Sequence, residues 1–294
     1  MKESPIKDYL SKLPRNEPLY YFANPGSAGD ALIALATYQL FYELGIDYHI
    51  VNGSRPFNPA GKIMLYGGGG NLVQYYDTAR KAILEHYLHL KKLVILPHTI
   101  QANEDLLSRF RDNVDVICRE PVSYAHVKQH APRANVYLMD DMAFNLDAAA
   151  LLADNSFAKD PVPLSWKLRD DLLETFLPLR LALARRFRLG ERGTLNAFRK
   201  DIESSRRFPR RDSVDLGTLF SHGTDNEAVT RYVSRRLLKV LNRYQTIRTD
   251  RLHVCIAAAM LGKQVEFFAN SYSKCEAVYL YSIKSRFPNV HWMG

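Results

Sequence analysis

The densest group of residues able to do chemistry is the run Thr249-Asp250-Arg251-Leu252-His253. It lies where a strand pattern gives way to a helix pattern, and the unpaired N–H groups of a helix start favour anions. Arg251 offers a planar fork for a carboxylate or phosphate, and His253 can carry a proton near neutral pH. A lone histidine at such a place is usually structural, but the combination predicts an acid beside a bound anion.

Four consecutive glycines, Gly67 to Gly70, precede Asn71. Close approach of backbone N–H groups to an anion is one explanation, and a plain tight turn is the other. The run is not G-x-G-x-x-G, and neither it nor the segment Gly26 to Asp30 contains the G-K-[ST] of a phosphate-binding loop. These departures argue against a nucleotide site.

Other polar residues follow apolar runs, where a parallel sheet exposes its ligand-binding edge. His98 follows Leu96-Pro97, and Arg119 follows a strand pattern that ends at Cys118. Arg119 predicts a fork directed at a ligand; the alternative is an ion pair with Glu120 or another nearby acid.

Two further acids are candidates for proton transfer. Of the pair Asp140-Asp141, one carboxylate could orient or deprotonate a sugar hydroxyl while the other caps a turn. Asp30, at the head of a helix pattern, is by default a first-turn acid that satisfies free N–H groups.

The composition excludes several classes of protein. The 294 residues are 47% hydrophobic and 24% charged, which is globular and long enough for two α/β domains. Three cysteines without a C-x-x-C pair fit a reducing compartment and argue against a structural zinc site. We see no ligand spacing for a metal and expect no cofactor. The polar start and the lack of a long apolar run predict a cytoplasmic protein without a signal peptide or membrane span.

The net charge of +9 is concentrated in one segment. Residues 180–211, here called the basic belt, contain eleven Lys or Arg against three acids, which is +8. The belt predicts an anionic partner such as a membrane surface. The lack of interleaved aromatic residues and of nucleic-acid motifs argues against nucleic acid. A solvated helix face is the alternative.

Strand and helix patterns alternate along the chain. The strands expected in the first half are Pro18 to Ala23, Tyr48 to Val51, Lys62 to Tyr66, Leu93 to Leu96, Val114 to Cys118 and Val136 to Leu138. The helices expected between them begin at Ala31, Tyr76 and Val122. This alternation predicts a mainly parallel sheet covered on both faces.

A polar stretch from Asn145 to Leu164 with two prolines predicts the crossing to a second α/β unit. We therefore expect an N-terminal domain over residues 1–150 and a C-terminal domain over 151–294. The elements expected in the second are helices at Leu164 to Phe187, Asn226 to Asn242, Leu252 to Leu261 and Glu276 to Lys284, and strands at Thr194 to Arg199, Gln245 to Thr249 and Val265 to Ala269.

In this order, these motifs resemble those of the polysaccharide pyruvyl transferase family. The resemblance is carried by Gly29-Asp30-Ala31-Leu32, Gly68-Gly69-Gly70-Asn71, Leu96-Pro97-His98-Thr99-Ile100, Arg119-Glu120-Pro121-Val122-Ser123, Asp141-Met142-Ala143-Phe144, Thr249-Asp250-Arg251-Leu252-His253 and Asn270-Ser271-Tyr272-Ser273-Lys274. Each motif is weak alone, but seven in fixed order are specific. They cover most of the chain except the basic belt.

The resemblance implies two Rossmann-like domains facing a cleft, similar to the GT-B glycosyltransferase fold. It also implies phosphoenolpyruvate as donor and a saccharide acceptor, lipid-linked or nucleotide-linked, from a cell-surface polysaccharide precursor. His253, Asp30 and Asp141 would then be catalytic. The donor-binding residues would be Arg119, Arg251, Gly69, Gly70, Asn71 and Lys274, and the residues expected to line the cleft are His98, Ser123, Asn270 and Tyr272.

Two alternatives from other classes stay open at this point. A GT-B glycosyltransferase would share the architecture but use a nucleotide sugar. A non-catalytic protein that binds a polyanion or a membrane surface would depend on the basic belt alone.

Overall fold

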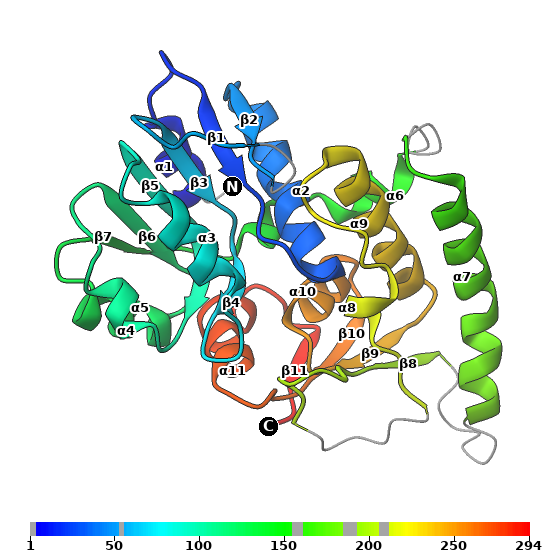
Figure 1. The fold of residues 1–294 in the computed structure, drawn as a ribbon. Coiled ribbons are helices and arrows are strands. Elements are labelled where there is room, and N and C mark those ends of the chain that lie inside the picture. Colours follow the sequence, from blue (N-terminus) through cyan, green and yellow to red (C-terminus); the bar gives the residue numbers. More distant parts are fainter. Residues whose placement is uncertain (1–3, 53–55, 155–160, 185–192, 206–211) are drawn as a thin grey trace. The chain divides into compact units, whose positions relative to one another are not determined.

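The computed structural model describes residues 4–52, 56–154, 161–184, 193–205 and 212–294. These residues form two compact units, each with a parallel sheet (Figure 1). Unit 1 comprises residues 1–25, 33–146 and 224–227, and unit 2 comprises residues 26–32, 147–223 and 228–294. Each unit therefore includes one short segment from the part of the sequence that otherwise forms the other unit: residues 224–227 belong to unit 1, and residues 26–32 belong to unit 2. Tyr38 Oη donates to the carbonyl oxygen of Thr224 at 3.1 Å, which ties the segment 224–227 into unit 1.

Unit 1 contains a seven-stranded sheet in the order β2-β1-β3-β5-β6-β7, with β4 paired to β5. The strands are β1 (Leu19–Phe22), β2 (Tyr48–Ile50), β3 (Ile63–Tyr66), β4 (Gly69–Leu72), β5 (Lys92–Ile100), β6 (Val114–Cys118) and β7 (Asn135–Leu138). The helices are α1 (Pro5–Ser11), α2 (Ala28–Glu43), α3 (Thr78–His86), α4 (Glu104–Leu107), α5 (Pro121–His130) and the 3₁₀ turn η1 (Met142–Asn145). Strand pairs are parallel throughout, as the alternation predicts.

The order of the strands places a topological switch point between β1 and β3. The next strand in sequence, β2, pairs with one edge of β1, and the strand after that, β3, pairs with the other edge. Ligands of open parallel sheets bind at such a point, beyond the carboxyl ends of the strands. The segments after β1 and β3, which contain Asn24 and the glycine run, begin there.

Unit 2 contains a four-stranded parallel sheet in the order β11-β10-β9-β8. Its strands are β8 (Thr194–Ala197), β9 (Thr246–Thr249), β10 (Gln264–Phe267) and β11 (Val290–Trp292). Its helices are α6 (Ala148–Ala153), α7 (Leu164–Ala184), α8 (Leu216–Leu219), α9 (Glu227–Asn242), α10 (Leu252–Met260), α11 (Lys274–Val278) and the π-helical segment η4 (Tyr279–Ile283). The first residue of α9, Glu227, belongs to unit 1.

The structure differs from the sequence-based expectations at several elements. Strand β5 does not end at Leu96 but continues through Pro97 to Ile100, because the ladder to β6 shifts register between Ile95 and His98 and tolerates a residue without an N–H. Half of the glycine run is not a turn but strand β4. Helix α1 in the polar start, α6 in the expected crossing, and strand β11 were not expected.

Helix α7 is held in unit 2 by buried charged groups as well as by the buried Leu177 and Leu181. The Asp170 carboxylate is fully buried and accepts from Tyr232 Oη at 3.0 Å, and Glu174 contacts Arg236 at 2.7 Å and Arg243 at 2.9 Å. Pro178 inside the helix leaves the Glu174 carbonyl without its usual helical donor, and Arg243 Nη1 donates to that oxygen at 2.8 Å. These bonds fix which side of α7 faces the protein.

We predict that Glu174→Ala lowers the free energy of unfolding by about 3 kcal/mol, because it removes the buried partner of Arg236 and leaves that buried charge only the exposed Asp171. The matched control is Asp171→Ala, which removes the exposed second partner of Arg236 and should cost less than about 1 kcal/mol. Urea unfolding followed by circular dichroism measures both. Equal losses in the two variants would contradict the role given to burial.

Candidate active site

In unit 1, the glycines of the 67–70 run are required by close packing. A Cβ at Gly67 would lie 2.5 Å from the backbone nitrogen of Asn24, and one at Gly68 would lie 2.8 Å from the carbonyl oxygen of Pro97. None of the four has a positive φ, so a left-handed turn is not the reason for them. The run packs against Asn24, which follows β1, and against Pro97 inside β5; Asn24 Oδ1 also accepts from Tyr66 Oη at 2.8 Å.

His98 lies inside β5 rather than beyond a strand, and its side chain is fully buried. Its Nε2 is 3.3 Å from the backbone nitrogen and 3.1 Å from Oδ1 of Asn71. The structure therefore brings the predicted residues His98 and Asn71 together, as two side chains that hold β4 against β5. Gly69 packs against both Asn24 and His98.

Arg119 and Asp141 form a buried ion pair. Arg119 Nη1 donates to Asp141 Oδ2 at 2.7 Å and its Nε donates to Thr99 Oγ1 at 2.9 Å, while the two residues are 1% and 0% exposed. Asp141 Oδ1 also accepts from the Ala143 N–H at 2.8 Å and so caps η1. The pair joins the ends of β5 and β6 to the segment after β7.

The residues after Arg119 form a helix start. Glu120 is the N-cap of α5 and accepts from the Ser123 N–H, with Pro121 at the first helical position. Ser123 Oγ accepts from the Ile100 N–H at 2.7 Å and is fully buried. Ser123, expected near a ligand, thus fastens α5 to β5.

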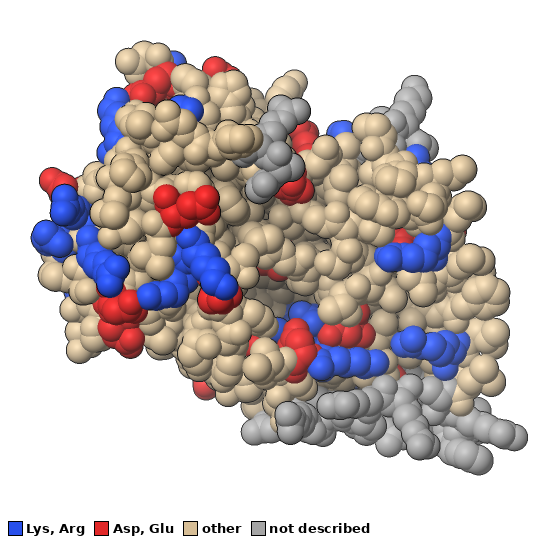
Figure 2. Space-filling view, in the orientation of Figure 1, with Lys and Arg blue, Asp and Glu red and all other residues tan. Residues whose placement is uncertain are grey.

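In unit 2, residues beyond β8, β9 and β10 converge in a network of ion pairs. Arg199 contacts Asp201 at 2.7 Å and Glu203 at 2.6 Å, and Arg251 contacts Asp201 at 2.9 Å and Asp215 at 2.6 Å. Lys274 Nζ lies 2.5 Å from Glu203. The members are Arg199, Asp201, Glu203, Asp215, Asp250, Arg251 and Lys274, here called the strand-end network. On the face shown in Figure 2, red and blue side chains lie next to one another in several separate groups.

Burial and charge act against each other on the acids of the strand-end network. Burial raises the pKa of Asp250 to about 6. A hydrogen bond from the Arg199 N–H lowers this pKa but offsets only part of the effect of burial. Burial would also raise the pKa of Asp201, but the Arg199 hydrogen bond and the neighbouring positive charges lower it to about 2. For Glu203 too, burial raises the pKa, but the charges of Lys274 and Arg199 prevail and lower it.

Two of the predicted catalytic residues, Asp30 and His253, lie in unit 2 on segments that meet. A Cβ at Gly29 would lie 2.7 Å from Nδ1 of His253, so the Gly29 backbone packs on the imidazole. Asp30 is a helix-start acid: its Oδ2 accepts from the Ser27 N–H at 2.8 Å and from Ser27 Oγ at 3.1 Å. His253 is half-buried in the first turn of α10 and is therefore accessible to a ligand.

The remaining predicted residues of unit 2 surround Glu203. Asn270 Nδ2 donates to Glu203 Oε2 at 3.4 Å, and Lys274 Nζ lies 5.0 Å from the centre of the Tyr272 ring. Gly217 packs on the Arg251 guanidinium, where a Cβ would lie 2.6 Å from Cζ. The structure therefore brings Arg251, Lys274, Asn270 and Tyr272 into one group.

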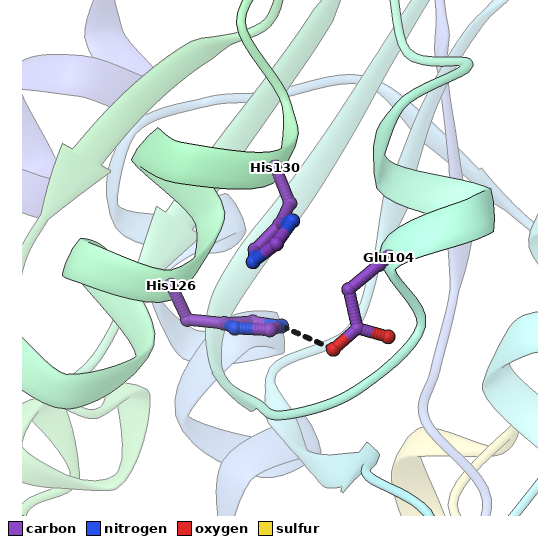
Figure 3. Close-up of side chains that lie close together, drawn as sticks. All are labelled: Glu104, His126 and His130. Carbon is purple, nitrogen blue, oxygen red and sulfur yellow. Dashed lines mark ion pairs between the residues drawn. The ribbon is translucent and has the colours of Figure 1, made fainter.

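Sequence analysis missed one group able to hold a divalent cation. Glu104 on α4 and His126 and His130 on α5 place ligand atoms within 4.8 Å of one another, and they point toward one another in Figure 3. His126 Nε2 also lies 2.9 Å from the Ala102 carbonyl oxygen. The signal was the i, i+4 spacing of the two histidines, but a distant glutamate completes the set. The group belongs to the α4–α5 surface of unit 1.

The basic belt lies mostly outside the described residues. Of its eleven basic residues, the structure describes Arg180, Arg199 and Lys200. Arg199 is buried in the strand-end network, whereas Arg180 is exposed on α7. All three cysteines are buried free thiols, and burial raises the pKa of Cys118.

A model of the polysaccharide pyruvyl transferase family matches residues 28–272. The chain belongs to the polysaccharide pyruvyl transferase family. It is 26% identical over 295 residues to a Bacillus subtilis (strain 168) protein named "Putative pyruvyl transferase EpsO", covering 92% of this chain and 86% of that protein. It is also similar to the crystal structure of KP1_0663, an uncharacterised protein from Klebsiella pneumoniae subsp. pneumoniae NTUH-K2044, with a TM-score of 0.77, 30% identity and complete coverage of both chains.

The family confirms the resemblance carried by the seven motifs and does not favour the nucleotide-sugar glycosyltransferase or the non-catalytic binder. It also marks the chain as a transferase. Sequence analysis did not identify the acids of the strand-end network. Asp201 and Glu203 enter it only as charges of the basic belt and Asp215 not at all, because no local pattern separates a buried carboxylate from a solvated one.

The raised pKa of Asp250 has a consequence for stability. A buried acid whose pKa is higher in the folded chain destabilises the fold as pH rises from about 4 to about 6. We predict that Asp250→Asn, which still accepts from the Arg199 N–H, becomes more stable relative to wild type over this range by up to about 3 kcal/mol. Urea titrations at stepped pH measure the difference.

The control variant, at Asp201, should show the opposite dependence of stability on pH. The pKa of Asp201 is lowered to about 2, so its contribution is present above about pH 4 and is lost as pH falls toward 2. Asp201→Asn should therefore be destabilised at neutral pH and approach wild type in acid. Parallel curves for the two variants would disprove the assignment.

Proposed function

We propose that the chain transfers the enolpyruvyl group of phosphoenolpyruvate to a saccharide of a cell-surface polysaccharide precursor and closes it to a pyruvate ketal. The observation that carries the proposal is the packing of Gly29 on His253, two family motifs more than 200 residues apart in the sequence. The GT-B arrangement of two domains facing a cleft stays a prediction, as does a cytoplasmic, membrane-peripheral location suited to a lipid-linked acceptor.

In the proposed reaction, His253 donates a proton to the methylene carbon of phosphoenolpyruvate, which becomes a methyl group and leaves positive charge on the neighbouring carbon. A sugar hydroxyl oxygen attacks that carbon and releases its proton. The carbon–oxygen bond to phosphate then breaks, and a second hydroxyl attacks and releases a proton to close the ketal. One of the two released protons restores His253 and the other leaves with phosphate. Such acid–base help is worth about 10²–10⁴ in rate.

Arg251 is the residue that we propose to contact the donor. Its Nη2 contacts both Asp201 and Asp215, and its Nε faces Asp215. The acids fix the plane of the guanidinium at the start of α10, two residues from His253, and a planar guanidinium suits a carboxylate or phosphate of the donor. Lys274, within the same group, adds positive charge.

Asp30 is proposed to accept a proton from the acceptor sugar, since its segment lies against His253. In unit 1, we propose that the predicted residues hold the strand ends in position. The support is the buried pair of Arg119 and Asp141 and the contacts of His98, Asn71 and Ser123. Direct contact of these residues, and of Gly69 and Gly70, with a substrate stays a prediction.

We predict that phosphoenolpyruvate raises the melting temperature of the chain and that a uridine nucleotide sugar does not, because a ligand stabilises the state that binds it. His253→Ala should keep donor affinity within a few-fold and lower turnover by at least about tenfold. The matched control is His291→Ala, which changes an exposed histidine on β11. Turnover in His253→Ala above about a tenth of wild type would exclude His253 as the acid.

Arg251→Lys should weaken phosphoenolpyruvate binding measured by calorimetry, because an ammonium keeps the charge but not the planar fork. Arg248→Lys is the matched control: Arg248 also lies on this part of the chain, in β9, and pairs with Glu266 at 2.7 Å on the neighbouring strand. Equal affinities in wild type and Arg251→Lys would remove Arg251 from the donor site.

A further inference from the structure

Helix α7 presents its apolar side chains away from the protein. Six large apolar side chains of the helix are 56–69% exposed: Leu164, Leu168, Leu172, Phe176, Leu179 and Leu183. At about 100° per residue these positions fall on one side of the helix. We call them the α7 stripe. A water-exposed helix normally shows the opposite pattern.

The inward side of α7 explains why the helix cannot turn its apolar face to the core. Asp170 and Glu174 are buried on that side together with Leu177 and Leu181. Their bonds to Tyr232, Arg236 and Arg243 fix the rotation of the helix about its axis. The α7 stripe is therefore a fixed surface, and contiguous apolar surface of this kind marks an interaction site.

The position of α7 leaves the stripe open within unit 2. Figure 1 shows the helix at the margin of the unit, with α9 on its inner side and no described element on its outer side. In Figure 2 the same margin is mostly tan, interrupted by blue side chains.

The size of the α7 stripe argues against a second copy of the chain as its partner. A helix of 21 residues is about 30 Å long and about 10 Å wide, so the stripe offers on the order of 300 Å². A stable interface between two proteins takes about 800 Å² from each. A lipid surface has no such minimum, because a helix lying in it buries its apolar face in full.

The charges beside the α7 stripe favour an anionic lipid surface. Lys167, Arg169 and Arg180 are the basic residues of α7, and Arg180 is exposed next to the stripe. The nearest exposed acid of the helix, Asp171, is held by Arg236 at 2.6 Å. The chain's excess positive charge begins at Arg180, where the helix ends its last turns. Leu and Phe on one face with basic neighbours is the composition of helices that lie in a membrane interface.

We propose that the α7 stripe inserts into the interface of an anionic membrane and holds the chain there. The helix lies parallel to the lipid surface, and it does not cross it: among the described helices, none is both long and apolar enough to span a bilayer. This surface gives the proposed peripheral location a physical basis independent of the chemistry at His253.

The test is co-sedimentation of the full chain with vesicles of phosphatidylcholine containing about 30% phosphatidylglycerol, compared with phosphatidylcholine alone. The variant carries Leu172→Gln, Phe176→Gln and Leu179→Gln, and the matched control carries Leu88→Gln, Ile202→Gln and Leu280→Gln, which are equally exposed elsewhere. We expect wild type and control to bind anionic vesicles alike and the stripe variant to bind at least about tenfold more weakly.

Further readouts separate the alternatives. Wild type should keep measurable binding at high salt, which screens charges but not apolar insertion, and a Leu172→Trp variant should shift its emission to the blue on anionic vesicles. Equal vesicle binding by wild type and the stripe variant, or complete loss of wild-type binding in salt, would overturn the proposal in favour of charge alone.

A dimer in light scattering that the stripe variant abolishes, with no vesicle binding by either protein, would assign the stripe to a second copy. Since none of these measurements uses phosphoenolpyruvate, their failure leaves the proposed reaction untouched.

Discussion

Buried pairing between strand-end arginines and loop carboxylates is the constraint on which both units depend. Polar groups must follow the strands of a parallel sheet if the sheet is to bind a ligand, yet each of these arginines is more than nine-tenths buried. Arg119 is compensated by Asp141 in unit 1, and Arg199 and Arg251 by Asp201, Glu203 and Asp215 in unit 2. Removing one partner of such a pair is costly because the other charge stays in a poorly solvated place. The loops beyond the strands are therefore held in place by charge.

The same pairs show how far sequence reasoning reaches. Apolar runs that alternate with helix patterns predicted the parallel sheets, because strands buried on both faces are largely apolar, as β3 and residues 93–96 of β5 are. The sequence leaves Arg119 two possible partners, a ligand or a nearby acid. In the structure its partner is Asp141, an acid 22 residues away. Such a partner has no local signature. His98 was misplaced for a related reason: Pro97 looks like the end of a strand unless the register shift that accommodates it is known.

The glycines illustrate the same limit. A glycine in a left-handed turn is recognisable from its neighbours, whereas Gly29, Gly67, Gly68 and Gly217 are needed because another segment lies against them. At Gly29 that segment is His253, and at Gly217 it is Arg251. Two residues proposed for the reaction are thus each bounded by a glycine distant in sequence, which only the folded chain reveals.

The division of the chain into units also bears on its synthesis. Unit 1 contains residues 224–227, and unit 2 contains residues 26–32. A chain emerging from a ribosome therefore cannot complete its first unit until residue 227 has been made, although domains usually fold as they appear. Until then, helix α2 lacks the Thr224 carbonyl to which Tyr38 donates. Unit 1 is therefore completed only after residues 26–32 and 147–223 of unit 2 have been synthesised.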